Sequence, residues 1–235
     1  MELYTSLLEA LEREYDTIRC LKESPRGCVT LLRHRQSGTR LLFRRFTGSG
    51  AVYRRLLPLS SPHLPQILEV AEAGDQVAVV EEYVEGDTLS SLLEAECLRP
   101  AVARRIAREL CQALWVLHGL GAVHRDVKPE NVILRGSEAV LIDFDASRLV
   151  KPRQEADTQV LGTTGYAPPE QYGLSQTDGR ADIYALGVLL NVMLTGQHPS
   201  RALAGGQLGR VVRKCTMMNP QNRYPDVLRL MEALG

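Results

Sequence analysis

Two short segments in the middle of the chain hold most of the residues that could do chemistry. Residues 124–131 have the sequence HRDVKPEN, and Asp143 follows twelve positions later. Transfer of a phosphoryl group from a nucleotide requires a carboxylate that orients the accepting hydroxyl and a cation that offsets the developing charge. It also requires an amide oxygen and a second carboxylate to hold Mg²⁺. We expect these roles to fall, in that order, to Asp126, Lys128, Asn131 and Asp143.

Short apolar runs flank these residues and predict the elements that position them. Residues 124–131 lie on a tight loop between a helical pattern and the apolar run 132–134. Asp143 comes directly after a second apolar run, residues 140–142. Strand ends of this kind hold reactive groups to within about half an ångström. A third segment, residues 162–170 (GTTGYAPPE), adds a further carboxylate.

Hydrophobic periodicity divides the chain into a β-rich first part and a helical second part. Short apolar runs separated by turns predict strands at residues 28–32, 41–46, 67–70 and 77–83. Apolar residues at steps of three and four predict helices at residues 100–120, 181–194, 208–217 and 225–234. A further short helix is predicted before Tyr15, with leucines sharing one face at positions Leu3, Leu7, Leu8 and Leu11. We therefore expect an α+β fold.

Composition and charge exclude several classes of protein. The 235 residues are 44% hydrophobic and 24% charged, which is typical of a globular chain with a sizeable core. The 28 basic and 28 acidic residues give a net charge of zero, which argues against a general nucleic-acid or anionic-membrane binder. The acidic N-terminus argues against a secretory signal, and no apolar run is long enough to cross a bilayer.

The cysteines indicate a reducing compartment. Five are present, and their spacing forms neither a C-x-x-C pair nor a zinc site. An odd, scattered set predicts reduced thiols, buried as small hydrophobic residues, in a cytoplasmic protein. The positions are Cys20, Cys28, Cys97, Cys111 and Cys215.

The three chemical segments occur in the order and at the spacing of a known family. H-R-D-x-K-x-x-N, D-F-x beginning at Asp143, and G-T-x-x-Y-x-x-P-E are all present, so the sequence resembles the eukaryotic-type protein kinases in their bacterial serine/threonine branch. The resemblance covers roughly residues 15–235. It implies one kinase-like domain over residues 1–235 with a bilobal α+β fold. The small β-rich N-lobe would span about residues 15–83 and the larger helical C-lobe residues 84–235.

The resemblance also implies roles for individual residues. The catalytic set is Asp126, Lys128, Asn131 and Asp143, of which Asn131 and Asp143 would hold Mg²⁺, or Mn²⁺ in its place. ATP would lie between the lobes, against Gly27, Val29, Leu42, Arg44, Glu82, Val84 and Ile133. Asp182 would support the catalytic loop, and Glu170 would pair with Arg223.

The N-lobe departs from the family pattern. The stretch aligned with the glycine-rich loop is Lys22–Val29, in which only Gly27 of three glycines remains and Pro25 removes an N–H. Arg44 stands where the family places its strand-3 lysine, and arginine keeps the charge but changes the geometry of its donors. Leu42 stands where a small alanine normally lines the adenine pocket.

The usual partner of the strand-3 lysine, a glutamate on helix C, has no equivalent in this sequence. Residues 24–68 contain no Asp or Glu, and the expected helix, residues 49–57 at most, is stopped by Pro58. We hypothesise that Glu81 pairs with Arg44 instead, because a lone buried carboxylate is costly. The alternative is that Glu81 points to solvent.

The activation segment, residues 143–170, contains two open questions. Asp145 replaces the glycine of the family motif; it could bridge Arg125 or Arg148, help to recruit metal, or simply be tolerated. Thr158 is the expected phosphorylation site, with Arg125 as the receiver of its phosphate, and an unmodified threonine is the alternative.

These observations together predict a cytoplasmic serine/threonine protein kinase that transfers the γ-phosphoryl group of ATP to protein hydroxyls, at a rate that the altered loop lowers. The alternative is a pseudokinase, a nucleotide-binding or scaffolding module that regulates a protein partner. A kinase of small molecules is a third interpretation, and residues 162–170 argue against it because they resemble a peptide-binding platform. Neither nucleic acid nor a membrane segment is expected among the partners.

Overall fold

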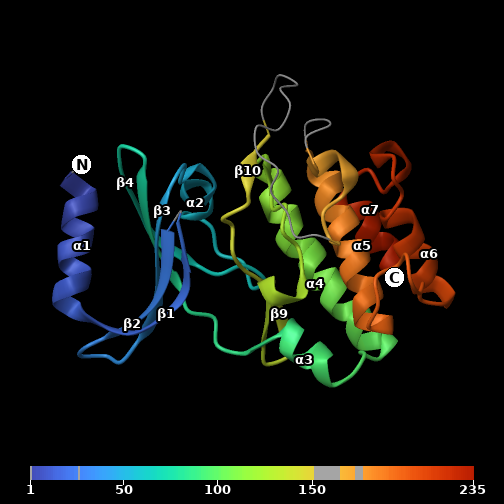
Figure 1. The fold of residues 1–235 in the computed structure, drawn as a ribbon, viewed down its shortest axis with the longest axis horizontal. Coiled ribbons are helices and arrows are strands. Elements are labelled where there is room, and N and C mark those ends of the chain that lie inside the picture. Colours follow the sequence, from blue (N-terminus) through green and yellow to red (C-terminus); the bar gives the residue numbers. More distant parts are fainter. Residues whose placement is uncertain (1, 26, 151–164, 173–176) are drawn as a thin grey trace. The chain divides into compact units, whose positions relative to one another are not determined.

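A computed structural model describes residues 2–25, 27–150, 165–172 and 177–235 of the chain. The chain divides into two compact units. The first consists of Met1–Ser61 and Pro65–Val84, and the second of Pro62–Leu64 and Glu85–Gly235. A β-sheet dominates the first unit and helices dominate the second, so the fold is α+β as predicted (Figure 1).

The first unit is built on a five-stranded antiparallel sheet. Its elements are α1 (Glu2–Glu14), β1 (Tyr15–Ser24), β2 (Gly27–His34), β3 (Arg40–Thr47), α2 (Ala51–Leu56), β4 (Ile67–Ala73) and β5 (Gln76–Glu82). The strands lie in the order β1-β2-β3-β5-β4. The four predicted strands are therefore β2, β3, β4 and β5, whereas β1 is an additional strand at the edge of the sheet.

Helix α1 lies against one face of this sheet. Its Leu11 is buried in a cluster with Leu32 of β2 and Val80 of β5. The predicted short helix before Tyr15 is therefore present, but Leu3 at its start is 57% exposed. The first turn of α1 therefore extends beyond the apolar surface that the sheet provides.

The second unit contains most of the helices. Its elements are β6 (Asp87–Thr88), α3 (Leu89–Ala95), α4 (Pro100–Gly119), β7 (Ala122–Val123), η1 (Pro129–Asn131), β8 (Val132–Arg135), β9 (Glu138–Leu141), β10 (Arg148–Leu149), η2 (Pro169–Tyr172), α5 (Gly179–Thr195), α6 (Gly206–Cys215), η3 (Pro220–Asn222) and α7 (Val227–Leu234). Strands β6, β8 and β9 form one small sheet, and β10 pairs with β7. The predicted long helices correspond to α4, α5, α6 and α7.

Helix α5 is the central helix of the second unit, and α4 and α6 pack against it (Figure 1). It is apolar nearly all round and buried along most of its length, as its sequence predicts. The Asp178 carboxylate caps its first turn by accepting from the Arg180 N–H at 2.8 Å. Gly196 ends the helix in the left-handed conformation, with φ of 69°.

The cysteines only partly follow the expectation of burial. Cys111 on α4 and Cys215 on α6 are buried, and burial raises the pKa of the Cys111 thiol to about 12. Cys20 and Cys97 are exposed instead. Among the described residues, no helix is both long enough and apolar enough to cross a membrane.

Candidate active site

The loop between β7 and β8 brings three of the predicted catalytic residues together. The Lys128 ammonium lies 2.8 Å from Oδ2 of Asp126, and Asn131 Nδ2 donates to the same oxygen at 2.9 Å. Asn131 Nδ2 also donates to the Asp126 backbone carbonyl at 2.9 Å. The side chains of Asp126 and Lys128 are mostly but not fully buried, so a fixed carboxylate and a fixed cation remain within reach of a ligand.

The geometry of Asn131 leaves its carbonyl oxygen for another role. Both hydrogen bonds of its side chain run from Nδ2 to Asp126, so the amide is oriented with Oδ1 as the remaining acceptor. Strands β8 and β9 place Asp143 next to it, since Val132 pairs with Leu141 and the Ile142 N–H donates to the Asn131 carbonyl at 2.9 Å. The predicted metal-binding pair is thus brought together by the end of one hairpin.

Two residues of this site have left-handed backbone conformations that side chains rarely adopt. Arg125 has φ of 69° and Asp143 has φ of 68°. Such backbone strain concentrates at functional sites, where the surrounding structure holds it in place. At Asp143 the carboxylate accepts from the Asp145 N–H at 3.2 Å, and the Asp145 side chain is exposed.

His124 is buried and links the β7–β8 loop to the segment that leads to Asp143. Its Nδ1 accepts from the Asp126 N–H at 3.3 Å, which leaves Nε2 to donate to the Ile142 carbonyl, also at 3.3 Å. The ring also meets Phe144 edge-on, with centroids 5.6 Å apart. Burial lowers the pKa of His124, against the opposing effect of the carboxylates of Asp182, Asp126 and Asp143. The neutral form fits these hydrogen bonds.

Asp182 on α5 binds the backbone of the β7–β8 loop, as the resemblance implies. Its Oδ2 accepts from the His124 N–H at 2.9 Å and lies 2.8 Å from His118 Nε2. Its Oδ1 accepts from the Arg125 N–H at 2.8 Å. Burial alone would raise the pKa of Asp182, but hydrogen bonding and charge from His118, followed by His124 and the Arg125 N–H, lower it. The carboxylate therefore stays ionised and fixes two consecutive backbone groups.

The predicted pair of Glu170 and Arg223 is present and buried. Arg223 donates from Nη1 to Oε1 at 2.5 Å and from Nη2 to Oε2 at 2.9 Å, a bidentate geometry. The guanidinium also donates to the backbone carbonyls of Met217, Met218 and Arg180. This single residue ties the segment that ends at Glu170 to α5 and to the loop after α6.

Sequence reasoning missed two residues that position the loop. His118 on α4 binds the Asp182 carboxylate through Nε2. Gln171, not singled out at all, donates from Nε2 to the Arg125 carbonyl at 2.8 Å. The sequence offers only proximity as a signal for these two residues. His118 lies six positions before His124, and Gln171 directly follows Glu170.

In the first unit, Arg44 on β3 pairs with Glu81 on β5, as hypothesised. Arg44 Nε donates to Glu81 Oε1 at 2.6 Å, and both side chains are almost fully buried. Leu42 lies opposite Glu81 and Arg44 lies opposite Val79, so the pair is a diagonal contact on one face of the sheet. The alternative, a solvent-facing Glu81, is wrong.

The short helix α2 supplies no acidic partner for Arg44. It covers Ala51–Leu56, inside the predicted limits, and buries Val52 and Tyr53. Its N-terminus is held by Glu72 of β4, whose Oε1 accepts from the Gly50 N–H at 2.9 Å, while Oε2 pairs with Arg54.

The residues predicted to contact ATP fall in both units. Gly27, Val29, Leu42, Arg44, Glu82 and Val84 belong to the first unit, and Ile133 to the second. Val29 is the strand partner of Arg44, and Glu82 accepts from the Gln66 N–H through Oε2 at 3.1 Å. Gly27 is required locally, because a Cβ there would lie 2.1 Å from the Arg45 carbonyl. The predicted phosphosite, Thr158, lies outside the described residues.

The donor set fits a magnesium–nucleotide ligand. Within the described ranges, no cluster of three His, Cys, Asp or Glu side chains could hold a metal ion by itself. Magnesium does not need such a cluster, because it is commonly held by one or two carboxylates together with substrate phosphates. The Asp143 carboxylate and the free acceptor oxygen of Asn131 are hard oxygen ligands of the kind that it prefers.

The α+β fold and the bonded set of Asp126, Lys128 and Asn131 beside Asp143 are those expected of a protein kinase, and sequence comparison agrees with this class. The protein kinase domain family matches residues 53–229, more than half of the chain, and the chain belongs to that family. The match begins at Tyr53, after the three strands β1, β2 and β3, where the sequence departs from the family pattern.

Individual relatives are bacterial serine/threonine-protein kinases. The chain is 35% identical to pkn2 of Myxococcus xanthus over 71% of its own length and 20% of that protein. It is 33% identical to PknB of Mycobacterium tuberculosis over 71% of the chain and 32% of that protein. It is 33% identical to PkaB of Streptomyces coelicolor over 83% of the chain and 48% of that protein. The chain thus spans less than half the length of each relative.

Proposed function

We propose that this protein is an ATP-dependent serine/threonine protein kinase, acting as a single kinase domain over residues 1–235. The observation that carries the proposal is the bonded set of Asp126, Lys128 and Asn131 beside Asp143. Its relatives are named as serine/threonine-protein kinases, which supports the class of acceptor. We extend the proposal to protein substrates and to a cytoplasmic location, the latter on the pattern of thiols in the sequence.

The chemistry assigned to the chain is that of positioning and charge. Asp126 would orient the hydroxyl of the substrate and accept its proton, and Lys128 would offset negative charge on the transferred group. Asn131 and Asp143 would hold Mg²⁺, which when bound neutralises charge on the phosphates. Asp182, His118 and His124 act through the backbone, by keeping the loop in its strained conformation.

Arg44 would take the place of the strand-3 lysine in contacting ATP, with Glu81 as its fixed counter-ion. Glu81 binds Nε of the guanidinium, at 2.6 Å. Arginine has five donors in a fixed fork, so binding at Nε does not exhaust its capacity to contact phosphate oxygens. Gly27, Val29, Leu42, Glu82, Val84 and Ile133 complete the proposed nucleotide contacts.

The test is intact-mass spectrometry of the purified chain, incubated with Mg-ATP and with casein as an added acceptor. We expect phosphate on casein or on the chain itself with the wild type. Asp126→Asn and Asp143→Asn should lower the rate by about 10²-fold or more, since each removes a group used in the reacting state. Asp75→Asn is the matched control, because Asp75 lies in an exposed turn of the first unit.

Two outcomes would contradict the proposal in different ways. Absence of phosphate transfer with both Mg²⁺ and Mn²⁺, together with a rise in melting temperature on adding ATP, would identify a nucleotide-binding pseudokinase. Absence of transfer and of any ATP-induced shift would remove the nucleotide from the function altogether.

A further inference from the structure

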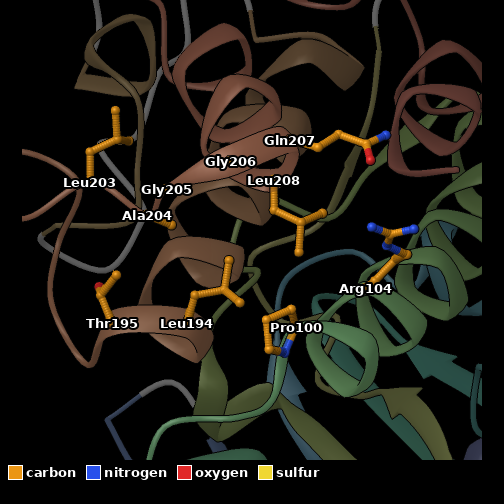
Figure 2. A pocket seen from close by; sticks show the side chains of 10 residues that line it. All are labelled: Pro100, Arg104, Leu194, Thr195, Leu203, Ala204, Gly205, Gly206, Gln207 and Leu208. Atoms are coloured by element: carbon orange, nitrogen blue, oxygen red, sulfur yellow. The ribbon is translucent and has the colours of Figure 1, made fainter.

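A pocket within the second unit lies apart from the catalytic loop. It has a volume of about 420 Å³, is open to solvent, and is lined by the start of α4, the end of α5, the start of α6 and the residues just before α6. Figure 2 shows Pro100 of α4, Leu194 of α5 and Leu208 of α6 facing one another across it. We call it the α4–α6 pocket. None of the residues proposed for phosphoryl transfer lines it.

The walls of the α4–α6 pocket are mainly apolar. Its apolar lining includes the exposed Pro100, the half-buried Leu194 and the buried Leu208, and Leu203 is 37% exposed. Concave apolar surfaces of about 300–1,000 Å³ with a few polar groups are typical of small-molecule sites. The volume here falls at the lower end of that range, which matches a small ligand rather than a large cofactor.

Arg104 gives the pocket its charge. Among the described residues, no acidic side chain pairs with it, and its buried Nε has no hydrogen-bond acceptor. Its neighbours on α4 differ: Arg105 lies 3.6 Å from Glu109, and Arg108 donates to the Met231 carbonyl. Because Nε has no accessible surface, a ligand in the pocket would be bound by the terminal nitrogens of the guanidinium, whose charge favours an anionic acceptor.

The first turn of α6 adds partial positive charge on the same side. Its N-cap residue, Gly205, offers no side-chain acceptor to the first N–H groups of the helix. Figure 2 shows the Arg104 guanidinium and the amide end of Gln207 extending toward the same side of the pocket. Arg104 is the single charged side chain in the lining, which suits a monoanion better than a phosphate.

We propose that the α4–α6 pocket binds a small apolar carboxylate, with its carboxylate on Arg104 and its hydrocarbon part against Pro100, Leu194 and Leu208. Such a ligand supplies an acceptor for the guanidinium and cover for Leu194 and Leu203, which are partly exposed. Binding would join the starts of α4 and α6 to the end of α5, which is the helix that carries Asp182.

The test is isothermal titration calorimetry of the full chain with sodium octanoate and sodium benzoate, with 1-octanol as the uncharged counterpart. We expect at least one acid to bind, and 1-octanol to bind more weakly than octanoate. Arg104→Gln should weaken binding of the acid by roughly tenfold to 100-fold, the effect of losing a hydrogen bond to a charged group. Arg210→Gln, an exposed arginine of α6 outside the lining, should leave binding unchanged.

A second variant keeps the test decisive if Arg104→Gln does not fold. Leu203→Glu places an anion at the exposed edge of the pocket and should also abolish binding of the acid. Leucine methyl NMR spectra should shift at Leu194, Leu203 and Leu208 when the acid is added. The measurement needs no nucleotide, so its result does not depend on the proposed kinase activity.

Three results would overturn the proposal. The first is no binding of either acid at millimolar concentration, and the second is equal affinity of wild type and Arg104→Gln for the acid. The third is that 1-octanol binds as well as octanoate, which would make the pocket an apolar surface without selectivity for acids.

Discussion

The Arg44 guanidinium on β3 is neutralised from within its own sheet, by Glu81 on β5. The two charged atoms are 2.6 Å apart, although the residues are 37 positions apart in the sequence. Their side chains are only 4% and 2% exposed, so the pair is effectively out of water. Glu81 on β5 thus carries the counter-charge for Arg44, and helix α2 does not supply it.

Glu81→Gln is expected to destabilise the protein by about 3 kcal/mol, because it leaves the Arg44 guanidinium buried without a counter-charge. Replacing both partners by apolar residues, Arg44→Met with Glu81→Leu, should recover most of that loss. Urea unfolding at neutral pH measures both effects. Asp16→Asn serves as the control, since Asp16 pairs with Arg35 at the surface and should matter little. An unchanged midpoint and unchanged ATP affinity in Glu81→Gln would show that the pair has no role.

Arg223→Ala is expected to cost more stability than Glu170→Ala. Removing Arg223 leaves the Glu170 carboxylate and three backbone carbonyls without their donor, at a cost of about 3–5 kcal/mol. Removing Glu170 leaves Arg223 bound to those carbonyls, so the loss should be about 1–3 kcal/mol. Arg229→Ala, which breaks an exposed ion pair with Glu232, is the matched control and should cause no measurable change. The reverse order of the first two would contradict the bonding described for Arg223.

Stability should fall on mild acidification because His124 is buried in its neutral form. Its pKa is lowered in the folded state, so the unfolded chain takes up the proton first as the pH falls. The contribution is fully present above the unfolded pKa of about 6.5 and is lost as the pH falls from there toward the folded pKa. The slope for one proton is at most about 1.4 kcal/mol per pH unit.

Urea titrations between about pH 7.5 and pH 5.5 test this expectation, because the interval brackets the ordinary histidine pKa. His124→Asn, which retains a donor and an acceptor without titrating, should show a smaller slope than the wild type. Equal slopes in the two proteins would assign the acid sensitivity to other groups. Asp182, whose pKa is lowered, contributes stability that is lost only at lower pH, below the ordinary carboxylate range.

Gly187→Ala should destabilise the second unit by roughly 1–3 kcal/mol, because the interior of a packed protein does not accept an extra methyl group. A Cβ at Gly187 on α5 would lie 2.3 Å from Cβ of Cys215 on α6. Gly119→Ala is the matched control, since a Cβ at this helical position meets nothing within 4 Å. Thermal unfolding should therefore show a lower melting temperature for the first variant and an equal or higher one for the second. Equal behaviour would mean that α5 and α6 are not closely packed.

The sequence predicted that Asp126, Lys128 and Asn131 lie together because they are close neighbours in the chain. Asp126, Lys128 and Asn131 lie within six positions, and the loop that joins them has few ways to fold. The long-range pair of Arg44 and Glu81 was also predictable, but only as one of two alternatives. A strand register shifted by one residue would turn Glu81 to the opposite face, and the sequence does not set that register by itself.

Other elements left little trace in the sequence. Strand β1 is exposed on both faces for nearly all of its length, so it has no alternation of apolar and polar residues. Helix α3 covers only Leu89–Ala95, too few residues to show a period of 3.6 clearly. The link between His118 and Asp182 spans 64 positions and depends on the packing of α4 against α5. Contacts of this kind arise from tertiary structure and have no local pattern.

During synthesis, the candidate site can form only after Asp182 has been added to the chain. The two backbone groups that its carboxylate fixes belong to residues made 57 and 58 positions earlier in the chain. A chain still growing on the ribosome has the full HRDVKPEN segment long before it has the anchor for that segment. Because domains are completed as their chain emerges from the N-terminal end, the loop can take its strained conformation only after α5 has been made and packed. Nascent or truncated chains that end before Asp182 should therefore carry every proposed catalytic residue and yet transfer no phosphate.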